Sequence, residues 1–264
     1  MKHQNKLQRL RQVGFFTKGA VYFILGTLAA LAAFGAGGNI SGKDGVMHFL
    51  LNLPLGKILM IIVTLGLAAY TLWRLYEAYE DPKSEDDSDR RWRNKASYLY
   101  SGLFYGFIAF SFAKALFSSP GGGDKKTAIM AQILDTSWGP WVLWAIVAIV
   151  IGQAGFQAYI AFTGKFMKRL DDFPNQKKAY KFIKYVGRMG YYSRALVFGI
   201  LAYFVARVII DHNASIYDGT KGVFQYLLGL QFGSILMAAV AVGLAAYGLF
   251  TILVGRYSNL TKLR

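Results

Sequence analysis

The sequence predicts an all-α, polytopic integral membrane protein with six transmembrane helices in three tandem two-helix repeats and short interfacial helices in the outer loops. Three observations predict this fold: the composition, six long apolar stretches and a repeated sequence pattern. Of the 264 residues, 55% are hydrophobic and only 17% are charged, whereas about a quarter of a soluble domain is charged. A lipid bilayer is therefore the expected solvent.

Six apolar stretches are long enough to span a membrane, because a hydrocarbon core of about 30 Å takes roughly 20 helical residues. They cover residues 14–34, 55–76, 97–117, 138–163, 190–210 and 230–254. An even number of spans places both ends of the chain on one side. The basic leader before the first stretch also fits a cleaved signal peptide, but that stretch has internal counterparts that cannot be cleaved off.

The basic residues indicate which side the termini occupy. The two tails and the loops after the second and fourth spans contain 20 of the 30 Lys and Arg residues. The other three loops contain only Lys43, Lys125, Lys126 and Lys221. Because cytoplasmic segments keep an excess of Lys and Arg, both termini are predicted to be cytoplasmic. The net charge of +16 then reflects topology, and no nucleic-acid partner is expected.

The pentapeptide GLAAY occurs twice, at 66–70 and at 243–247. Its surroundings align as well, because LPLGKILMIIVTLGLAAY from residue 53 pairs without a gap with LQFGSILMAAVAVGLAAY from residue 230. GFFTKGAVYF at 14–23 matches GYYSRALVFG at 190–199 and, with Ser101 in place of the cation, SYLYSGLFYG at 97–106. In the middle counterpart of the second segment, Phe156 takes the place of Tyr70 and Tyr247.

This pattern predicts one two-helix unit used three times. Each unit contains two spans, so all three enter the membrane in the same sense around a pseudo-threefold axis. The predicted units are repeat 1 at 14–82, repeat 2 at 97–164 and repeat 3 at 189–256, with cytoplasmic linkers at 83–96 and 165–188 and cytoplasmic tails at 1–13 and 257–264. In each outer loop, a short apolar run ending at Gly56, Gly139 or Gly233 predicts an interfacial helix that turns into the second span.

The segments GFFTKGAVYFILG, PLGKILMIIVTLGLAAYTLWRLYEA, AYIAFTGKFMKRLD and GRMGYYSRALVFGIL carry a family resemblance. Together they resemble the bacterial membrane-protein family named domain of unknown function 1206, from about Gly14 to Arg256. The resemblance implies an integral protein of a bacterial inner membrane and brings no activity or catalytic residue with it. Repeat 2 departs most from the pattern, at Ser101 and Gln153.

Charged side chains inside the predicted spans are the first functional candidates, because a charge in lipid is costly. Lys18 matches Arg194 in the repeat, and Lys114 matches Arg207. Arg194 and Arg207 are 13 residues apart, about 20 Å along a helix. All four cations are therefore predicted to lie near a membrane boundary and to snorkel to it. The alternative is that these cations bind an anionic lipid headgroup or a solute.

Aromatic and amide side chains form a second set of candidates. The repeat alignment predicts one aromatic layer from Tyr70, Phe156 and Tyr247, another from Tyr22, Tyr105 and Phe198, and added amides from Gln153 and Gln157. One interpretation is a set of interhelical hydrogen bonds that clamp the bundle. The other is a polar-lined solute cavity on the axis.

Two cytoplasmic features have simpler interpretations. Arg74 and Glu77 have the i, i+3 spacing of an interfacial ion pair at the end of a span. In the basic linker at 165–188, apolar residues after Pro174 recur at helical spacing between lysines. This pattern predicts an amphipathic helix on the cytoplasmic leaflet, where anionic headgroups attract Lys and Arg.

Several apparent motifs are discounted, so no catalytic residue, metal site or cofactor is predicted. The chain contains no cysteine, which excludes thiolate ligands and nucleophiles. The segment from Gly37 to Lys43 has the spacing of a phosphate-binding loop, but Asp44 replaces the required hydroxyl residue and no strand precedes it. His48 and His212 lack a third metal ligand.

The sequence therefore favours a non-enzymatic membrane scaffold or binding protein that associates with itself, with lipid or with another membrane protein. The alternative is a channel or carrier for a small solute or ion along the pseudo-threefold axis. A cavity lined by Tyr70, Gln153 and Tyr247 would favour this alternative, and a filled axis would exclude it. An enzyme acting at the outer interface is the third interpretation.

Overall fold

The computed structural model of the protein describes residues 2–35, 42–80, 88–117, 123–170, 177–216 and 218–257. Within these ranges the elements are all helical, and none is a strand. The helices are α1 (Lys2–Ala33), α2 (Gly42–Leu51), α3 (Gly56–Glu80), α4 (Ser88–Ala115), α5 (Gly123–Leu134), α6 (Gly139–Thr163), α7 (Lys177–Ile210), α8 (Gly219–Gly229) and α9 (Gly233–Tyr257), with 3-10 turns η1 (Lys165–Arg169) and η2 (Ala214–Ile216). Helices α1, α3, α4, α6, α7 and α9 are long and apolar enough to cross a membrane, which confirms the predicted fold class.

The first helix of each repeat extends further than its predicted span. Helix α7 begins at Lys177, so the amphipathic segment after Pro174 is not a separate helix but the first part of this span. Its apolar residues Ile183 and Val186 are buried, and a Cβ atom on Gly187 would collide with Phe166. Helix α7 continues through Gly187, and the missing side chain makes room for the Phe166 ring.

Residues 1, 36–41, 81–87, 118–122, 171–176, 217 and 258–264 lie outside the described residues. Most of the segment from Gly37 to Lys43, parts of both linkers and the C-terminal tail fall in them. Their predicted boundaries therefore stay predictions.

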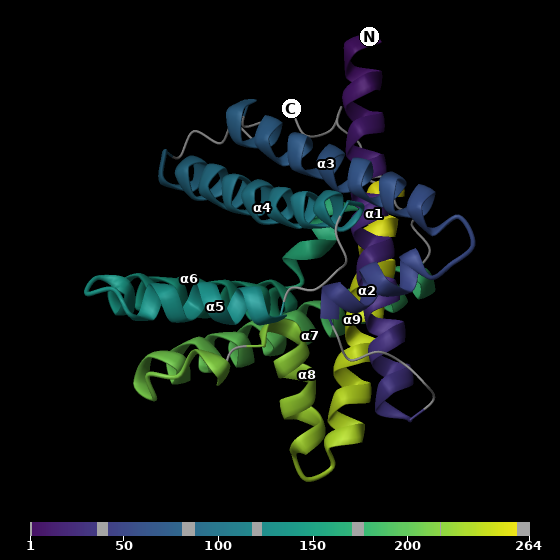
Figure 1. Cartoon of the computed structure of the whole chain (residues 1–264). Helices are drawn as coiled ribbons and strands as arrows, with labels where there is room; N and C mark the ends of the chain where they lie inside the picture. Colours follow the sequence, from purple (N-terminus) through teal and green to yellow (C-terminus); the bar gives the residue numbers. More distant parts are fainter. Residues whose placement is uncertain are drawn as a thin grey trace.

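The six spanning helices form a ring that is open at one place. The first helix of each repeat packs against the second helix of another repeat: α1 against α9, α4 against α3, and α7 against α6 (Figure 1). Within repeats, α1 packs against α3 and α7 packs against α9, but α4 and α6 do not pack against each other. The same helix contacts therefore recur from repeat to repeat, except within repeat 2, and the pseudo-threefold axis stays a prediction.

Helices α1 and α9 are antiparallel and packed closely through glycine. A Cβ atom on Gly19 would lie 2.7 Å from the Gly248 carbonyl oxygen, and one on Gly248 would lie 2.6 Å from the Gly19 carbonyl oxygen. Further along, a Cβ atom on Gly255 would contact Phe15. The small residues therefore let the two backbones approach each other, as in other membrane helix pairs.

The recurring pentapeptide has the same packing role in repeats 1 and 3. A Cβ atom on Gly14 would lie 2.6 Å from the Tyr70 backbone, and one on Gly190 would lie 2.6 Å from the Tyr247 backbone. The glycines of the pentapeptide itself, Gly66 and Gly243, lie against the hydroxyl side chains of Thr17 and Ser193 respectively.

The predicted glycine corners are also present. Helices α3, α6 and α9 begin at Gly56, Gly139 and Gly233, where a Cβ atom would collide with a carbonyl oxygen near the end of the preceding short helix. Leu55 and Phe232, which precede two of these glycines, both have a φ of 61°. This left-handed conformation costs a residue with a side chain roughly 1–2 kcal/mol.

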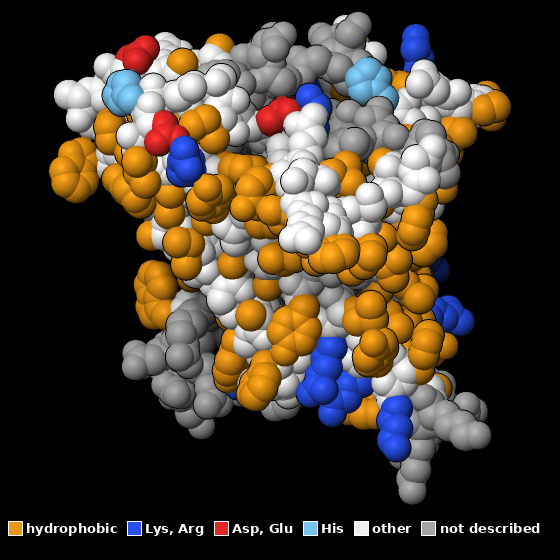
Figure 2. All heavy atoms as spheres, turned by 90° about the horizontal axis from the view of Figure 1, so that it is seen from below, with side chains coloured by type: hydrophobic (Ala, Val, Ile, Leu, Met, Phe, Trp, Pro, Cys, Tyr) orange, Lys and Arg blue, Asp and Glu red, His pale blue; other side chains and the backbone are white. Residues whose placement is uncertain are grey.

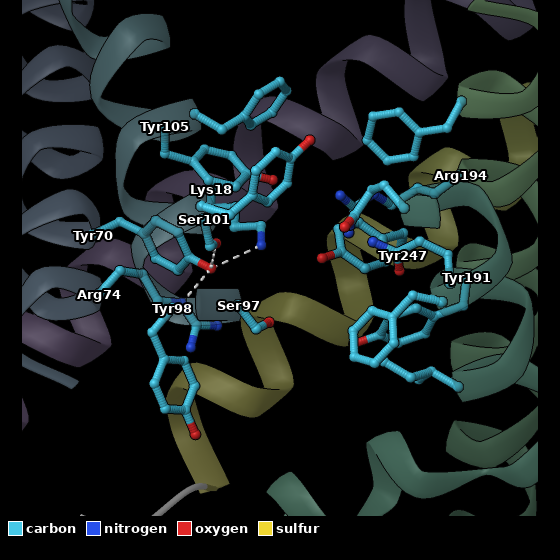
Figure 3. A pocket seen from close by; sticks show the side chains of 17 residues that line it. Lys18, Tyr70, Arg74, Ser97, Tyr98, Ser101, Tyr105, Tyr191, Arg194 and Tyr247 are labelled. Carbon is cyan, nitrogen blue, oxygen red and sulfur yellow. Dashed lines mark hydrogen bonds between the residues drawn. The ribbon is translucent and has the colours of Figure 1, made fainter. Parts of the chain in front are cut away.

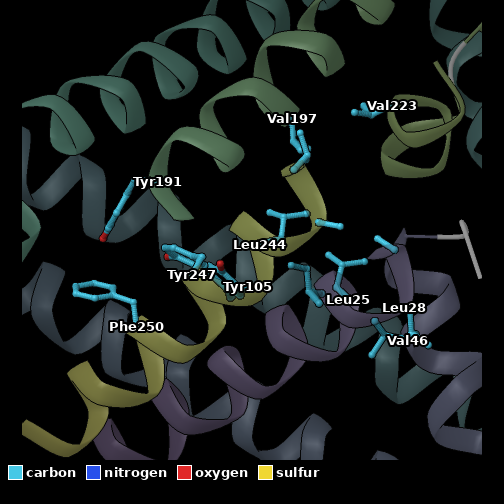
Figure 4. Packing of buried hydrophobic residues seen from close by; sticks show 14 of the residues in the cluster. Leu25, Leu28, Val46, Tyr105, Tyr191, Val197, Val223, Leu244, Tyr247 and Phe250 are labelled. Atoms are coloured by element: carbon cyan, nitrogen blue, oxygen red, sulfur yellow. The ribbon is translucent and has the colours of Figure 1, made fainter. Parts of the chain in front are cut away.

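The surface and the core have the polarity of a membrane protein. Figure 2 shows hydrophobic side chains over the middle of one face, Lys and Arg clusters at its lower edge, and Asp, Glu and His together with a few Lys and Arg near its upper edge. Inside, residues of all six spanning helices and of α2 and α8 contribute to one apolar cluster, part of which is drawn in Figure 4. It includes Leu25, Val46, Val197, Val223 and Leu244.

Candidate functional site

Two cavities lie inside the ring of helices. The larger has a volume of about 550 Å³ and mostly apolar walls, including Leu25, Ile108, Val197 and Leu201, and it reaches the outer-loop residues at 218–221. The smaller has a volume of about 60 Å³ and is lined by residues from all six spanning helices. A volume of about 300–1,000 Å³ is usual for ligand sites, so only the larger cavity is of that size.

Five residues line both cavities: Lys18, Phe104, Tyr105, Arg194 and Phe198. We call Lys18, Arg194 and the tyrosines around them, Tyr22, Tyr70, Tyr105 and Tyr247, the cation layer. Figure 3 shows Lys18, Tyr70 and Ser101 on one side of the smaller cavity and Arg194 with Tyr247 on the other. The layer thus lies between the larger cavity and the smaller one.

Lys18 is buried, with 4% of its surface exposed. Its Nζ atom donates a hydrogen bond to the Tyr70 hydroxyl at 3.0 Å and lies 4.6 Å and 4.4 Å from the ring centres of Tyr70 and Tyr105. Aromatic faces stabilise cations electrostatically. The Tyr70 hydroxyl and the two tyrosine rings therefore stabilise the Lys18 ammonium group in place of water.

The Tyr70 hydroxyl has no capacity left for a ligand. It accepts hydrogen bonds from Lys18 Nζ at 3.0 Å and from Arg74 Nε at 2.8 Å. It lies 3.4 Å from Ser101 Oγ. Because both lone pairs of a phenol oxygen are then used, Tyr70 is the donor to Ser101.

Arg194 is buried to a similar degree, with 6% of its surface exposed. Its guanidinium carbon lies 4.3 Å from the ring centre of Tyr247 and 5.2 Å from that of Tyr22. Its Nε atom is buried without a hydrogen-bond partner. Arg194 therefore keeps a donor that a ligand can use, whereas Lys18 already donates to Tyr70.

Lys18 and Arg194 are buried among helices, so they do not snorkel out of the protein, and the prediction that they lie near a membrane boundary stays a prediction. Lys18 comes ten residues after the start of its apolar segment, Gln8–Ala33, or about 15 Å by helical rise. Arg194 comes 15 residues after the start of Ala179–Ile210, or about 22 Å. The predicted span begins at residue 190, whereas α7 begins at Lys177.

Four tyrosines join the two sides of the layer. Tyr105 donates a hydrogen bond to the Tyr22 hydroxyl at 3.1 Å, and its ring centre lies 4.8 Å from that of Tyr70. Tyr22 in turn meets Tyr247 edge to face at 4.9 Å. The two predicted aromatic layers are therefore one cluster, which contains a hydrogen bond between helices and also lines a cavity.

The remaining aromatic and amide candidates lie at the edge of this cluster. Phe198 contacts Arg194 with its ring centre 5.4 Å from the guanidinium carbon. Gln153, Phe156 and Gln157 line the smaller cavity from α6. Gln157 is buried, and its Oε1 atom has no hydrogen-bond partner. Phe156 is 44% exposed, so it lies at the margin rather than in an aromatic layer with Tyr70 and Tyr247.

The other two cationic candidates are apart from the layer. Lys114 is exposed at the end of α4. Arg207 is exposed and pairs with Asp211 at 2.5 Å. Neither residue lines the two cavities. The repeat-matched positions of Lys114 and Arg207 therefore do not produce a shared anion site in this structure.

Arg74 and Glu77 form the predicted ion pair, with a separation of 2.5 Å. Both side chains are buried within the protein, and their place at the membrane interface stays a prediction. Glu77 compensates the positive charge of Arg74 only. Among the described residues, no carboxylate forms an ion pair with Lys18 or Arg194. The cation layer consequently carries two positive charges without a matching acid.

Sequence reasoning missed several residues of the smaller cavity: Ser97, Tyr98, Tyr100, Ser101, Phe104, Ile160 and Tyr191. The repeat pattern contained a signal for some of them. Tyr191 occupies the position of Phe15, and the two rings meet Tyr247 and Tyr70 respectively at the same centre distance of 5.3 Å.

Comparisons with known proteins agree with the repeat structure. The family described as Domain of Unknown Function (DUF1206) matches residues 13–81, 96–164 and 189–258. The chain is also 27% identical over 255 residues to a Bacillus subtilis (strain 168) protein described as "Uncharacterized protein YxxB", which covers 97% of this chain and 92% of that protein. No solved structure matches significantly. Three tandem copies of one two-helix unit, all matched by the same family, show that this chain belongs to the DUF1206 family.

Proposed function

We propose that this protein is a non-enzymatic binding protein of the bacterial inner membrane that holds an anionic group between Lys18 and Arg194. The observation that carries the proposal is the pair of buried cations without a carboxylate partner, beside a cavity of about 550 Å³. A charge removed from water without a partner costs several kcal/mol. A bound anion would offset that cost.

The chemistry of the two cations suits a carboxylate or a phosphate. A guanidinium group presents several donors in a plane and binds both anions through paired hydrogen bonds. Arg194 has an unpaired Nε atom, and Lys18 keeps two of the three donors of its ammonium group after its bond to Tyr70. We expect Arg194 to be the main anchor and Lys18 to add charge.

The orientation belongs to the proposal too. The basic tails and linkers favour cytoplasmic termini, with the smaller cavity facing the cytoplasm and the larger one facing outward. Anionic headgroups on the cytoplasmic side then neighbour the lysines of α7. Self-association and a membrane-protein partner stay predictions, and no cofactor, metal or nucleic acid enters the proposal.

A carrier is the second candidate. One observation favours it: cavities lie on both sides of the cation layer, and the smaller is lined by Tyr70, Gln153 and Tyr247. In this conformation the tyrosine cluster separates them. Transport would require the Tyr22 and Tyr105 contact to open, whereas binding does not.

A thermal-stability measurement tests anion binding directly. We expect dodecyl phosphate, added to protein in a neutral detergent, to raise the Tm by about 5–10 °C at a hundredfold excess over Kd, with no rise from dodecanol. Arg194→Gln should abolish the rise. The matched control is Arg207→Gln, which removes an exposed cation from the same helix. An equal rise in wild type and Arg194→Gln would contradict the proposal.

A further inference from the structure

We infer that the ligand of the cation layer is an anionic lipid of the surrounding bilayer, which enters between α4 and α6. This inference rests on the proposed function and names its ligand class and its route. It starts from the one place where the ring of spanning helices is open. The two helices of repeat 2 do not pack against each other, and the helices of the other repeats do.

Helix α6 has two glycines that face open space. Gly152 and Gly155 would each accept a Cβ atom with no other atom within 4 Å. The glycines that match Gly152 in repeats 1 and 3, Gly66 and Gly243, instead lie against a hydroxyl side chain. Helix α6 also exposes Ile149 and Ile151, as expected of a helix that lies in acyl chains.

Both cavities lie directly behind this opening. Phe107 of α4 lines the larger cavity and is 71% exposed, so that cavity reaches the outer surface of α4. Phe156 of α6 lines the smaller cavity and is also exposed. At this depth the surroundings of a six-span protein are hydrocarbon, which favours an amphiphile over a water-soluble anion.

From the smaller cavity to the larger one, the lining changes from polar to charged to apolar, as a lipid of the cytoplasmic leaflet does from its headgroup to its acyl chains. The smaller cavity offers polar groups such as Ser97, Ser101 and Gln157. The two cations come next, and the larger apolar cavity follows on the outward side. A lipid of that leaflet has its headgroup inward and its acyl chains toward the bilayer centre. Its phosphate would meet Arg194 and Lys18, and its chains would occupy the larger cavity.

Native mass spectrometry of the full chain can test the lipid and its site. We expect phosphatidylglycerol to be retained at least tenfold over phosphatidylcholine with the same chains. Arg194→Gln should lower that retention about tenfold, and Arg207→Gln should not. Leu201→Trp, which fills the larger cavity, should prevent retention, whereas Leu196→Trp, on the exposed face of the same helix, should not. Equal retention of both lipids, or full retention by Leu201→Trp, would overturn the inference.

The route has its own test, because the chain lacks cysteine. A pyrene maleimide label on Gly152→Cys should slow the exchange of phosphatidylglycerol at least tenfold. The same label on Gly199→Cys, where a Cβ atom also meets open space, should leave the rate unchanged. Equal rates for both labelled variants would overturn lateral entry. Binding of inorganic phosphate or dodecyl phosphate without any retained lipid would overturn the lipid assignment and leave the proposed anion site intact.

Discussion

Repeats 1 and 3 are closed hairpins, and repeat 2 is an open one. In the closed repeats, a glycine of the first helix lies against the backbone of Tyr70 or Tyr247, and the glycine of GLAAY lies against a hydroxyl side chain. Repeat 2 has Ser97 in place of the first glycine, and its second glycine, Gly152, touches nothing. The same unit can therefore either seal the ring or leave an entrance, depending on a few small residues.

The repeats differ in charge as well. Repeats 1 and 3 place Lys18 and Arg194 at matching positions against matching tyrosine rings, and repeat 2 has Ser101 there. The repeat that leaves the entrance is thus the one that contributes no cation. Substitutions at matched positions can show whether this division of roles is real.

The largest expected effect concerns Glu77, which repeat 1 has and repeat 3 lacks. Glu77→Gln leaves Arg74 buried without its 2.5 Å partner, which should lower the free energy of unfolding by about 3–5 kcal/mol. Thr251 is the residue of repeat 3 that matches Arg74. Thr251→Val should lower the free energy of unfolding by about 1 kcal/mol or less, because only the hydrogen bond from its hydroxyl to the Tyr247 carbonyl is lost. Denaturant titration in detergent measures the free energy of unfolding of both variants. Similar losses in the two would contradict the expected difference between repeats 1 and 3.

The second effect tests the closed and open hairpins directly. Gly66→Ala and Gly243→Ala force a methyl group against Thr17 and Ser193, and each should cost about 1–3 kcal/mol. Gly152→Ala should cost nothing and can stabilise α6 by up to about 1 kcal/mol. Measuring the Tm of the three variants shows whether repeat 2 differs from repeats 1 and 3. A loss at Gly152 as large as at Gly66 would show that repeat 2 closes in solution.

A third, smaller effect concerns the corners before the second spans. Leu55→Gly and Phe232→Gly relieve a positive φ and should each raise the free energy of unfolding by about 1 kcal/mol. Trp138 holds the same place in repeat 2 with a φ of −95°, so Trp138→Gly should not stabilise. Thermal unfolding of the three variants provides the comparison, and stabilisation by all three would rule out backbone strain as its cause.

The smallest effect concerns the residue that replaces the cation in repeat 2. Ser101→Ala removes the acceptor at 3.4 Å from the Tyr70 hydroxyl and should cost about 0.5 kcal/mol. Binding of dodecyl phosphate should hardly change, because Ser101 carries no charge. A loss of binding similar to that of Arg194→Gln would instead place Ser101 among the ligand contacts.

Much of the fold follows from the sequence because hydrophobic length and repetition are local signals. The six spans, the short outer helices and the glycine corners at Gly56, Gly139 and Gly233 depend on residues adjacent in the chain. The pairing of Arg74 with Glu77 is equally local, since three residues separate them on one helix. These features were predictable without knowing which helices are neighbours.

The opening in repeat 2 and the burial of the cations were not predictable in this way. Gly152 and Gly155 do not reveal the opening, because a glycine suits close contact and empty surroundings equally well. The burial of Arg194 depends on which helices surround α7, and a basic amphipathic segment does not reveal whether it continues into a span. Both questions depend on partners distant in the chain.

The pairing of α1 with α9 has a consequence for biogenesis. Ribosomes deliver the chain from its N-terminus, so the glycine face of the first span has to wait for the last span before it gains its partner. Until then, Gly19 and Gly26 face acyl chains or an insertion factor. The pairing of α1 with α9 consequently follows the synthesis of the last span, and a nascent chain arrested before residue 233 should remain sensitive to membrane quality-control proteases.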